Sequence, residues 1–348
     1  MTSTGARIRV VAFLAIIVLG SVIDTTRRPM PTASAAEAQR DIELFRAVVA
    51  RVRAGTRYYE AMGTELRARR YPAASVFNWR TPLLYTAVAA IGPASARVLL
   101  ISLASALVVL TVVVLRTRST PALMAALFMQ FGAFVSVAVP SAPFLTEVWA
   151  GVLLGLSYCA YQMRVWRTAA VLALIGLFIR ELAAPYVVVC AWLALHGRRR
   201  HEVAVWIAGA ATYSIYFAWH LYHVKALQEP GDLAHAFSWL YGGGPIFLLQ
   251  TLRTNAWVFL ASAWIPTAPA LLAILLAACA WPGTTLRLRG IVTAYLAMFL
   301  VVGQPFNQYW GLLTAPLWAV ATADGVEALR HWLAIATQPP RSRAAADL

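Results

Sequence analysis

Long apolar runs recur from one end of this chain to the other, and they restrict its possible folds more than any other feature. The 348 residues are 61% hydrophobic and only 12% charged, which is about half the charged fraction of a soluble domain. A run of about 20 apolar residues spans the hydrocarbon core of a bilayer. There, only a helix or a closed barrel provides hydrogen bonds for all backbone N–H and C=O groups. The runs therefore predict an all-α, polytopic transmembrane protein. No polar stretch is long enough for a separate soluble domain, so we expect residues 1–348 to form a single membrane domain.

The apolar runs and their basic flanks together predict about ten membrane crossings that alternate in direction. Two of them, residues 168–179 and 183–195, are too short to cross the full hydrocarbon core as straight helices. The expected crossings are residues 8–23, 94–115, 121–139, 148–163, 168–179, 183–195, 203–222, 257–281, 290–302 and 312–323.

The net charge of +15 does not indicate a nucleic-acid partner, because much of it lies in short arginine-rich loops between the apolar runs. Such loops are cytoplasmic under the positive-inside rule, and we expect both termini on the same side. The two largest polar segments, 24–80 and 223–256, then form the first and second extracytoplasmic loops. The pattern predicts a multi-pass protein of a bacterial-type inner (plasma) membrane.

The beginning of the chain has some features of a secretory signal. Arg7 and Arg9 precede an apolar run, and the stretch ASA at 33–35 resembles a cleavage site. That stretch, however, lies about a dozen residues beyond the run, with two arginines and two prolines between. We therefore expect an uncleaved membrane anchor.

The first extracytoplasmic loop contains two stretches with helical amphipathic periodicity, 36–54 and 58–70. A basic helix with one apolar face lies in the membrane interface with that face down. Asp41 interrupts the apolar face of the first stretch, one turn before Phe45. Burying a carboxylate without a partner costs free energy, so Asp41 needs either a function or an ion-pair partner. Arg40 and Arg46 are the candidate partners.

The two short crossings are separated by the stretch RELA, which places Arg180 and Glu181 at the tip of a hairpin. One interpretation is a broken hairpin that reaches a polar cavity, since charged groups at membrane depth usually mark such sites. The alternative is an ion pair with a purely structural role.

The residues around Asp41 also form a recognisable pattern. Asp41 is followed by Phe45, then by Gly55 and Tyr59, and the stretch FNWRTPLLY at 77–85 leads into the next apolar segment. This pattern resembles the start of membrane glycosyltransferases of the GT-C superfamily, particularly bacterial mannosyltransferase-like families that use polyprenyl-phosphate sugars. The overall plan is similar as well, but the motif-level likeness is confined to residues 41–93. The chain departs from the pattern near its last crossings, where it has QPFNQYWG and no counterpart of a family histidine.

The resemblance implies an inverting transfer of a sugar from a polyprenyl-phosphate donor to a lipid or glycan acceptor, at an active site on the extracytoplasmic side. Asp41 would be the general base, and Arg180 and Arg80 would bind the donor phosphate, a role that suits the bidentate guanidinium. Asp24, at the end of the first crossing, is a candidate for a second catalytic acid; a charge at a helix end is the ordinary alternative. The resemblance leaves the sugar and the acceptor open.

Several other polar or aromatic residues are candidates for substrate contacts. Their ordinary alternatives are anchoring at the membrane interface and interfacial hydrogen bonding. No cofactor is expected: a divalent metal near His220 stays an alternative, but the chain has no compact metal-binding motif. The candidate substrate-binding residues are Tyr59, Glu60, Glu181, His220, Asn307, Tyr309 and Trp310.

Two other classes of function fit parts of the sequence. A transporter or flippase for a lipid or solute would also use broken helices and intramembrane charges, although the sequence contains no evident internal repeat. An assembly or scaffold protein is the third interpretation. The large interfacial first loop favours the glycosyltransferase, with membrane lipids, a lipid-linked donor and an acceptor as its partners.

Overall fold

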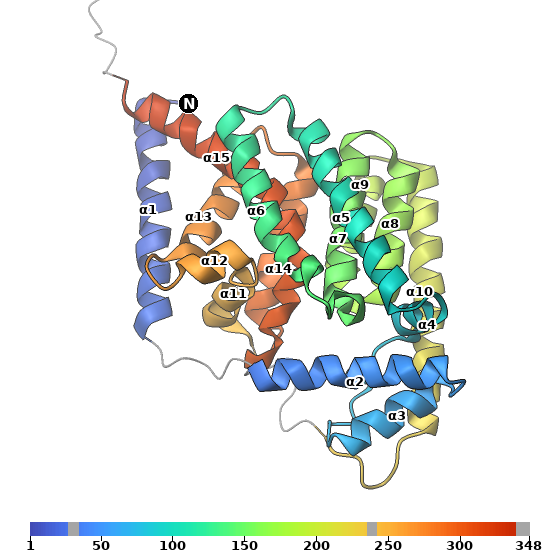
Figure 1. Cartoon of the computed structure of the whole chain (residues 1–348). Coiled ribbons are helices and arrows are strands. Elements are labelled where there is room, and N and C mark those ends of the chain that lie inside the picture. Colours follow the sequence, from blue (N-terminus) through green and yellow to red (C-terminus); the bar gives the residue numbers. More distant parts are fainter. Residues whose placement is uncertain (27–34, 235–241, 339–348) are drawn as a thin grey trace, which may run out of the picture.

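The computed structural model describes residues 1–26, 35–234 and 242–338, and the regular structure in these ranges is entirely helical. Most of the long helices run alongside one another in a bundle, whereas α2 lies across one end of it with α3 beside it (Figure 1). The α-helices are α1 (Ser3–Thr26), α2 (Ala35–Arg53), α3 (Tyr58–Ala68), α4 (Pro82–Ile91), α5 (Pro93–Leu115), α6 (Thr120–Ala138), α7 (Thr146–Gln162), α8 (Trp166–Ile179), α9 (Ala184–His196), α10 (Arg200–Ala226), α11 (Gly244–Leu252), α12 (Ala256–Ala261), α13 (Thr267–Ala280), α14 (Leu286–Val301) and α15 (Gly311–Ala336), and the 3₁₀ turns are η1 (Val76–Asn78), η2 (Ala142–Phe144), η3 (Glu181–Ala183) and η4 (Pro305–Trp310).

Three of the described helices, α1, α5 and α6, are long and apolar enough to cross a membrane, judged by length and composition. Their outward faces carry many exposed aliphatic side chains, as expected where lipid rather than water is the surrounding medium. An all-helical membrane protein is therefore supported, and the full number of about ten crossings stays a prediction.

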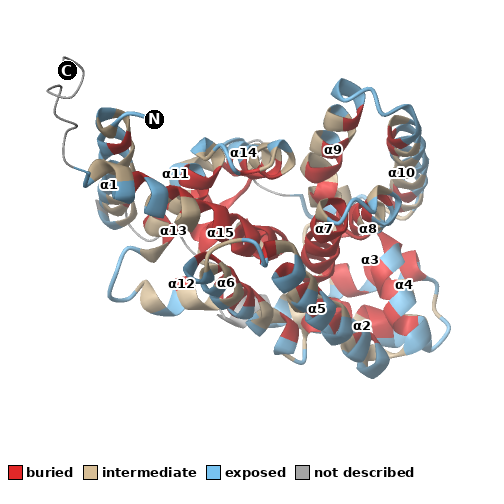
Figure 2. Ribbon diagram, turned by 90° about the horizontal axis from the view of Figure 1, so that it is seen from above, coloured by how far each residue is buried: buried red, intermediate tan, exposed pale blue. Residues whose placement is uncertain are grey.

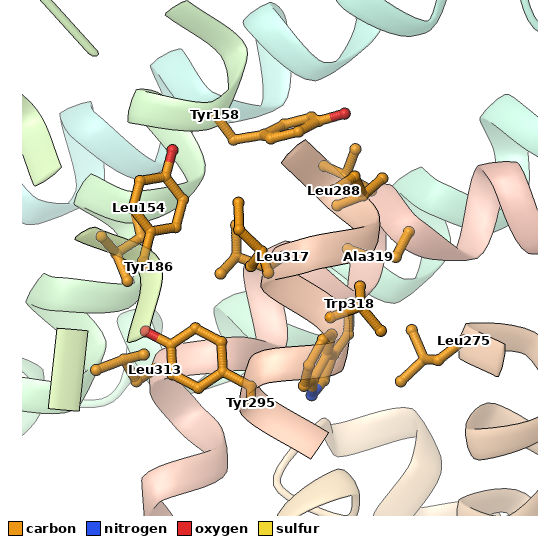
Figure 3. Packing of buried hydrophobic residues seen from close by; sticks show 14 of the residues in the cluster. Leu154, Tyr158, Tyr186, Leu275, Leu288, Tyr295, Leu313, Leu317, Trp318 and Ala319 are labelled. Carbon is orange, nitrogen blue, oxygen red and sulfur yellow. The ribbon is translucent and has the colours of Figure 1, made fainter. Parts of the chain in front are cut away.

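Helix α15 forms the centre of the bundle. It packs against α6, α7 and α13, and its first half is almost entirely buried (Figure 2). Figure 3 shows Leu317 and Trp318 of α15 among side chains of α7, α9 and α14, and the Trp318 ring meets Tyr295 edge to face. Gly151 of α7 permits this close packing, because a Cβ there would lie 2.8 Å from the carbonyl oxygen of Leu313.

The segment 257–281, which is expected to cross the membrane and contains two prolines, is not one helix, because the chain is divided there into α12 and α13. Pro266 lies between them; it has no N–H to donate, and it disfavours helical geometry at the preceding residue. The polar segment 223–256 is predicted to be a loop, yet it contains the buried helix α11. Helices α10 and α15 also extend beyond the expected 203–222 and 312–323.

The helices in the first polar segment, and the break between the two short apolar runs, lie where the sequence predicts them. Helices α2 and α3 occupy the two amphipathic stretches, and Leu44, Phe45, Val48 and Val49 are the buried residues of α2. A break between α8 and α9 falls at Arg180, whose backbone is extended, and η3 follows directly.

Candidate functional site

A cavity of about 270 Å³ lies where α2, the segment after α3 and the turn η4 meet. The cavity is at the end of the bundle that α2 crosses (Figure 1). It combines a basic and polar rim with the apolar side chains of α2 and α3. Its lining residues are Arg40, Asp41, Leu44, Phe45, Leu66, Arg70, Tyr71, Pro72, Asn78, Arg80, Phe306, Asn307 and Tyr309.

Asp41 is the only acidic side chain that lines this cavity among the described residues. Its Oδ1 accepts a hydrogen bond from the hydroxyl of Tyr71. Burial raises the pKa of the Asp41 carboxyl, and the hydrogen bond from Tyr71 and the charges of Arg80 and Arg40 lower it in part. The result is a pKa above the ordinary value for aspartate, the direction that makes a carboxylate a better proton acceptor.

The two arginines proposed as partners of Asp41 have other contacts. The Arg40 guanidinium lies 5.7 Å from the centre of the Tyr71 ring and donates to the carbonyl of Arg69 at 3.1 Å. The Arg46 guanidinium lies 5.9 Å from the ring of Phe144. Within the described part of the chain, neither arginine forms an ion pair with Asp41, so Tyr71 is the partner that the sequence did not reveal.

Arg80 reaches the same cavity from a strained backbone position, with φ of +51°. The Tyr58 hydroxyl helps to hold this turn by donating to the carbonyls of Trp79 and Arg80, at 2.7 and 3.1 Å. The Arg80 guanidinium donates to the Tyr309 hydroxyl at 3.0 Å, and no carboxylate of the described residues lies within ion-pair distance of it. Strained non-glycine residues of this kind are concentrated at ligand sites.

Turn η4 supplies part of the cavity wall. Asn307 is fully buried, and its side-chain amide lies 3.4 Å from the Tyr309 hydroxyl. Asn307, Tyr309 and Arg80 thus form one hydrogen-bonded group that lines the same cavity as Asp41. An amide, a phenol and an arginine around a cavity can bind hydroxyl groups and a phosphate.

Arg180 does not line the Asp41 cavity. It lines a smaller neighbouring cavity of about 120 Å³, and among the described residues only Arg80 borders both cavities. Arg180 is only 1% exposed, and its Nε lies 2.8 Å from Oε1 of Glu147. A second ion pair joins it to Glu181. Two carboxylates therefore surround Arg180 at the tip of the hairpin. Its expected role in binding the donor phosphate stays a prediction.

The remaining candidates also lie outside the Asp41 cavity. Asp24 forms an ion pair with Arg253. The Tyr59 hydroxyl of α3 lies 3.0 Å from Nδ1 of His220 of α10. Glu60 is exposed to solvent. Trp310 lines the smaller cavity beside Arg180.

Metal binding has no support in the described ranges. They contain no group of three or more His, Cys, Asp or Glu side chains placed to hold a metal ion.

The cavity contains residues that sequence reasoning did not select. Tyr71, Arg70, Asn78 and Phe306 all line it. Arg70 and Tyr71 follow a helix that ends in basic residues, but nothing in their spacing connects them with Asp41, which is 30 positions away from Tyr71 in the chain.

Comparisons with protein-family models, with curated proteins and with solved structures found no match to this chain.

Proposed function

We propose that this chain is an integral membrane glycosyltransferase of the GT-C type. It transfers a sugar from a polyprenyl-phosphate donor to a lipid or glycan acceptor on the extracytoplasmic face, with inversion at the anomeric carbon. The observation that carries the proposal is a single carboxylate, Asp41, in a cavity that three arginines, Arg40, Arg70 and Arg80, also line.

In the proposed reaction, Asp41 accepts the proton of the acceptor hydroxyl. The acceptor oxygen forms a bond to the anomeric carbon as the bond from that carbon to the phosphate oxygen breaks. The phosphate leaves with the electron pair, and the single displacement inverts the anomeric centre, as in inverting glycosidases that use water. The raised pKa of Asp41 supports this role.

The departing phosphate needs positive charge more than it needs a proton donor. Arg80 is the best-placed group, because its guanidinium faces the cavity without an ion-pair partner among the described residues. Arg40 and Arg70 add positive charge at the same cavity. Asn307 and Tyr309 are placed to bind sugar hydroxyls across from Asp41, as polar and aromatic groups do at sugar sites.

The membrane arrangement is part of the same proposal. Helices α2 and α3 lie along the extracytoplasmic surface, and the apolar bundle lies within the bilayer. The cavity is then at the depth of the lipid headgroups, where a lipid-linked donor presents its phosphate and sugar.

The test is transfer of label from a radiolabelled polyprenyl-phosphate sugar, in membranes that contain each variant. Asp41→Asn keeps the shape of the side chain and removes its basicity, so turnover should fall by about 10²–10⁴-fold. Donor binding should survive, since the arginines are untouched. Asp24→Asn, in an ion pair outside the cavity, is the control and should retain activity.

Two outcomes would contradict the proposal. Asp41→Asn with wild-type turnover, together with an inactive Asp24→Asn, would place the base elsewhere. Movement of intact labelled donor across the membrane, without transfer of its sugar, would indicate a flippase.

A further inference from the structure

A second concave surface lies far from Asp41, at the junction of α9 and α10. It is a groove of about 490 Å³. The last residues of α10 lie next to η1, near α3, and α10 has 27 residues. Its first residues are therefore about 40 Å away, at the end of the bundle opposite α2 (Figure 1). The residues lining the groove are Leu195, Arg198, Arg200, Val203, Ala204 and Ile207.

The groove has a basic mouth and an apolar floor. On α10, residues 200, 203, 204 and 207 lie on one face, because they are separated by three, four and seven positions. Leu195 and Ile207 are 64% and 65% exposed, although each is a large aliphatic side chain. A residue spacing of seven corresponds to about 10 Å along the helix, which is about two thirds of the hydrocarbon thickness of one leaflet.

The charge at the mouth is not neutralised within the described protein. Figure 2 shows the junction of α9 and α10 as exposed. Of its three arginines, Arg198, Arg199 and Arg200, Arg199 forms an ion pair with the buried Glu202 at 2.9 Å. The other oxygen of Glu202 accepts a hydrogen bond from Tyr161. Arg198 and Arg200 are exposed. Within the described ranges, no ion pair includes them and no acidic residue lines the groove. Two guanidinium groups thus flank the open end of an apolar channel.

We propose that this groove binds one anionic phospholipid. The phosphate of its headgroup lies between Arg198 and Arg200, and an acyl chain follows Leu195, Val203 and Ile207. Basic pockets between membrane helices are suited to anionic headgroups. The apolar floor favours a lipid over a free anion, because a soluble phosphate leaves this surface uncovered. A zwitterionic lipid binds less well, since its own cation balances its phosphate. The inference rests on the membrane placement of α9 and α10 and is independent of sugar transfer.

The test uses the purified full-length chain in a neutral detergent, with native mass spectrometry to count bound lipids. The probes are dioleoyl-phosphatidylglycerol, dioleoyl-phosphatidylcholine and glycerol-3-phosphate. We expect one phosphatidylglycerol to be retained in preference to phosphatidylcholine, and glycerol-3-phosphate to bind far more weakly. Arg198→Gln/Arg200→Gln should weaken phosphatidylglycerol binding by about 30-fold, given the usual contribution of two basic residues near an anionic headgroup.

A matched control is the double variant Arg164→Gln/Arg167→Gln. It removes the same charge, both arginines are exposed, and Arg164 has a positive φ like Arg198, but neither residue lines the groove. It should bind phosphatidylglycerol like the wild type. Ile207→Glu is a second, independent probe: it places a carboxylate in the channel at an exposed position and should also weaken retention of phosphatidylglycerol.

Three outcomes would overturn the proposal. One is equal retention by the wild type and Arg198→Gln/Arg200→Gln, and another is an equal loss in the control variant. Glycerol-3-phosphate binding as tightly as the lipid would show an anion site instead. Because no sugar donor is present, failure here is distinguishable from failure of the proposed transferase activity.

Discussion

Removal of one hydroxyl, in Tyr71→Phe, should shift the pH dependence of the proposed transfer. The hydroxyl donates to Asp41 and stabilises its ionised form, which lowers a pKa that burial raises. A hydrogen bond to a charged acceptor contributes about 1.5–3 kcal/mol, and each pKa unit corresponds to about 1.4 kcal/mol. The pKa of Asp41 should therefore rise by about 1–2 units in the variant. Since only the ionised carboxylate accepts a proton, activity is lost as the pH falls through this pKa.

The measurement is kcat/KM for sugar transfer as a function of pH. The acid limb for Tyr71→Phe should lie about 1–2 pH units above that of the wild type, with similar rates once Asp41 is fully ionised. Tyr309→Phe is the control, because it removes a hydroxyl from the same cavity that interacts with Arg80 rather than Asp41. An unchanged acid limb in Tyr71→Phe, or a shift toward lower pH, would refute the assignment of Asp41 as the titrating base.

Two further predictions concern stability and topology. Glu147→Gln should lower the free energy of unfolding in detergent by roughly 3 kcal/mol, because it breaks a buried ion pair with Arg180. The control Glu229→Gln, at an exposed ion pair, should lower it by at most about 1 kcal/mol. Equal losses in the two variants would argue against the buried pair as a support of the hairpin. Cysteine at the exposed position Thr64 should react with an impermeant thiol reagent in intact cells, and labelling only after lysis would place α3 on the cytoplasmic side.

Many of the helices could be predicted from the sequence, because the spacing of apolar residues along a helix is a local property of the chain. Apolar runs located the long helices, and the position of Asp41 on the apolar face of an amphipathic stretch set it apart from Glu43 on the polar face. The run at 257–281 is divided at Pro266 into α12 and α13, and an apolar run with prolines does not by itself show where the helix ends. Helix α11 was missed because it is short and lies within a segment that is polar on average.

The site was predictable only in part, because its contacts join distant segments. Asp41, Arg80, Asn307 and Tyr309 were selected from the sequence, and all four line one cavity. Tyr71 was missed, since a contact across 30 residues leaves no periodic signal. The carboxylate of Glu147 gives Arg180 a partner that only the folded chain brings near.

In the proposed mode of binding, the phosphate of a lipid-linked sugar lies at Arg80 and the anomeric carbon of the sugar faces Asp41. The most direct measurement is a structure of the chain with an unreactive phosphonate analogue of a polyprenyl-phosphate sugar. We expect the phosphonate within ion-pair distance of Arg80 and the sugar in the cavity between Asp41 and Asn307. An analogue bound along a path through the bundle, with the Asp41 cavity empty, would contradict the proposed sugar transfer and favour a transporter.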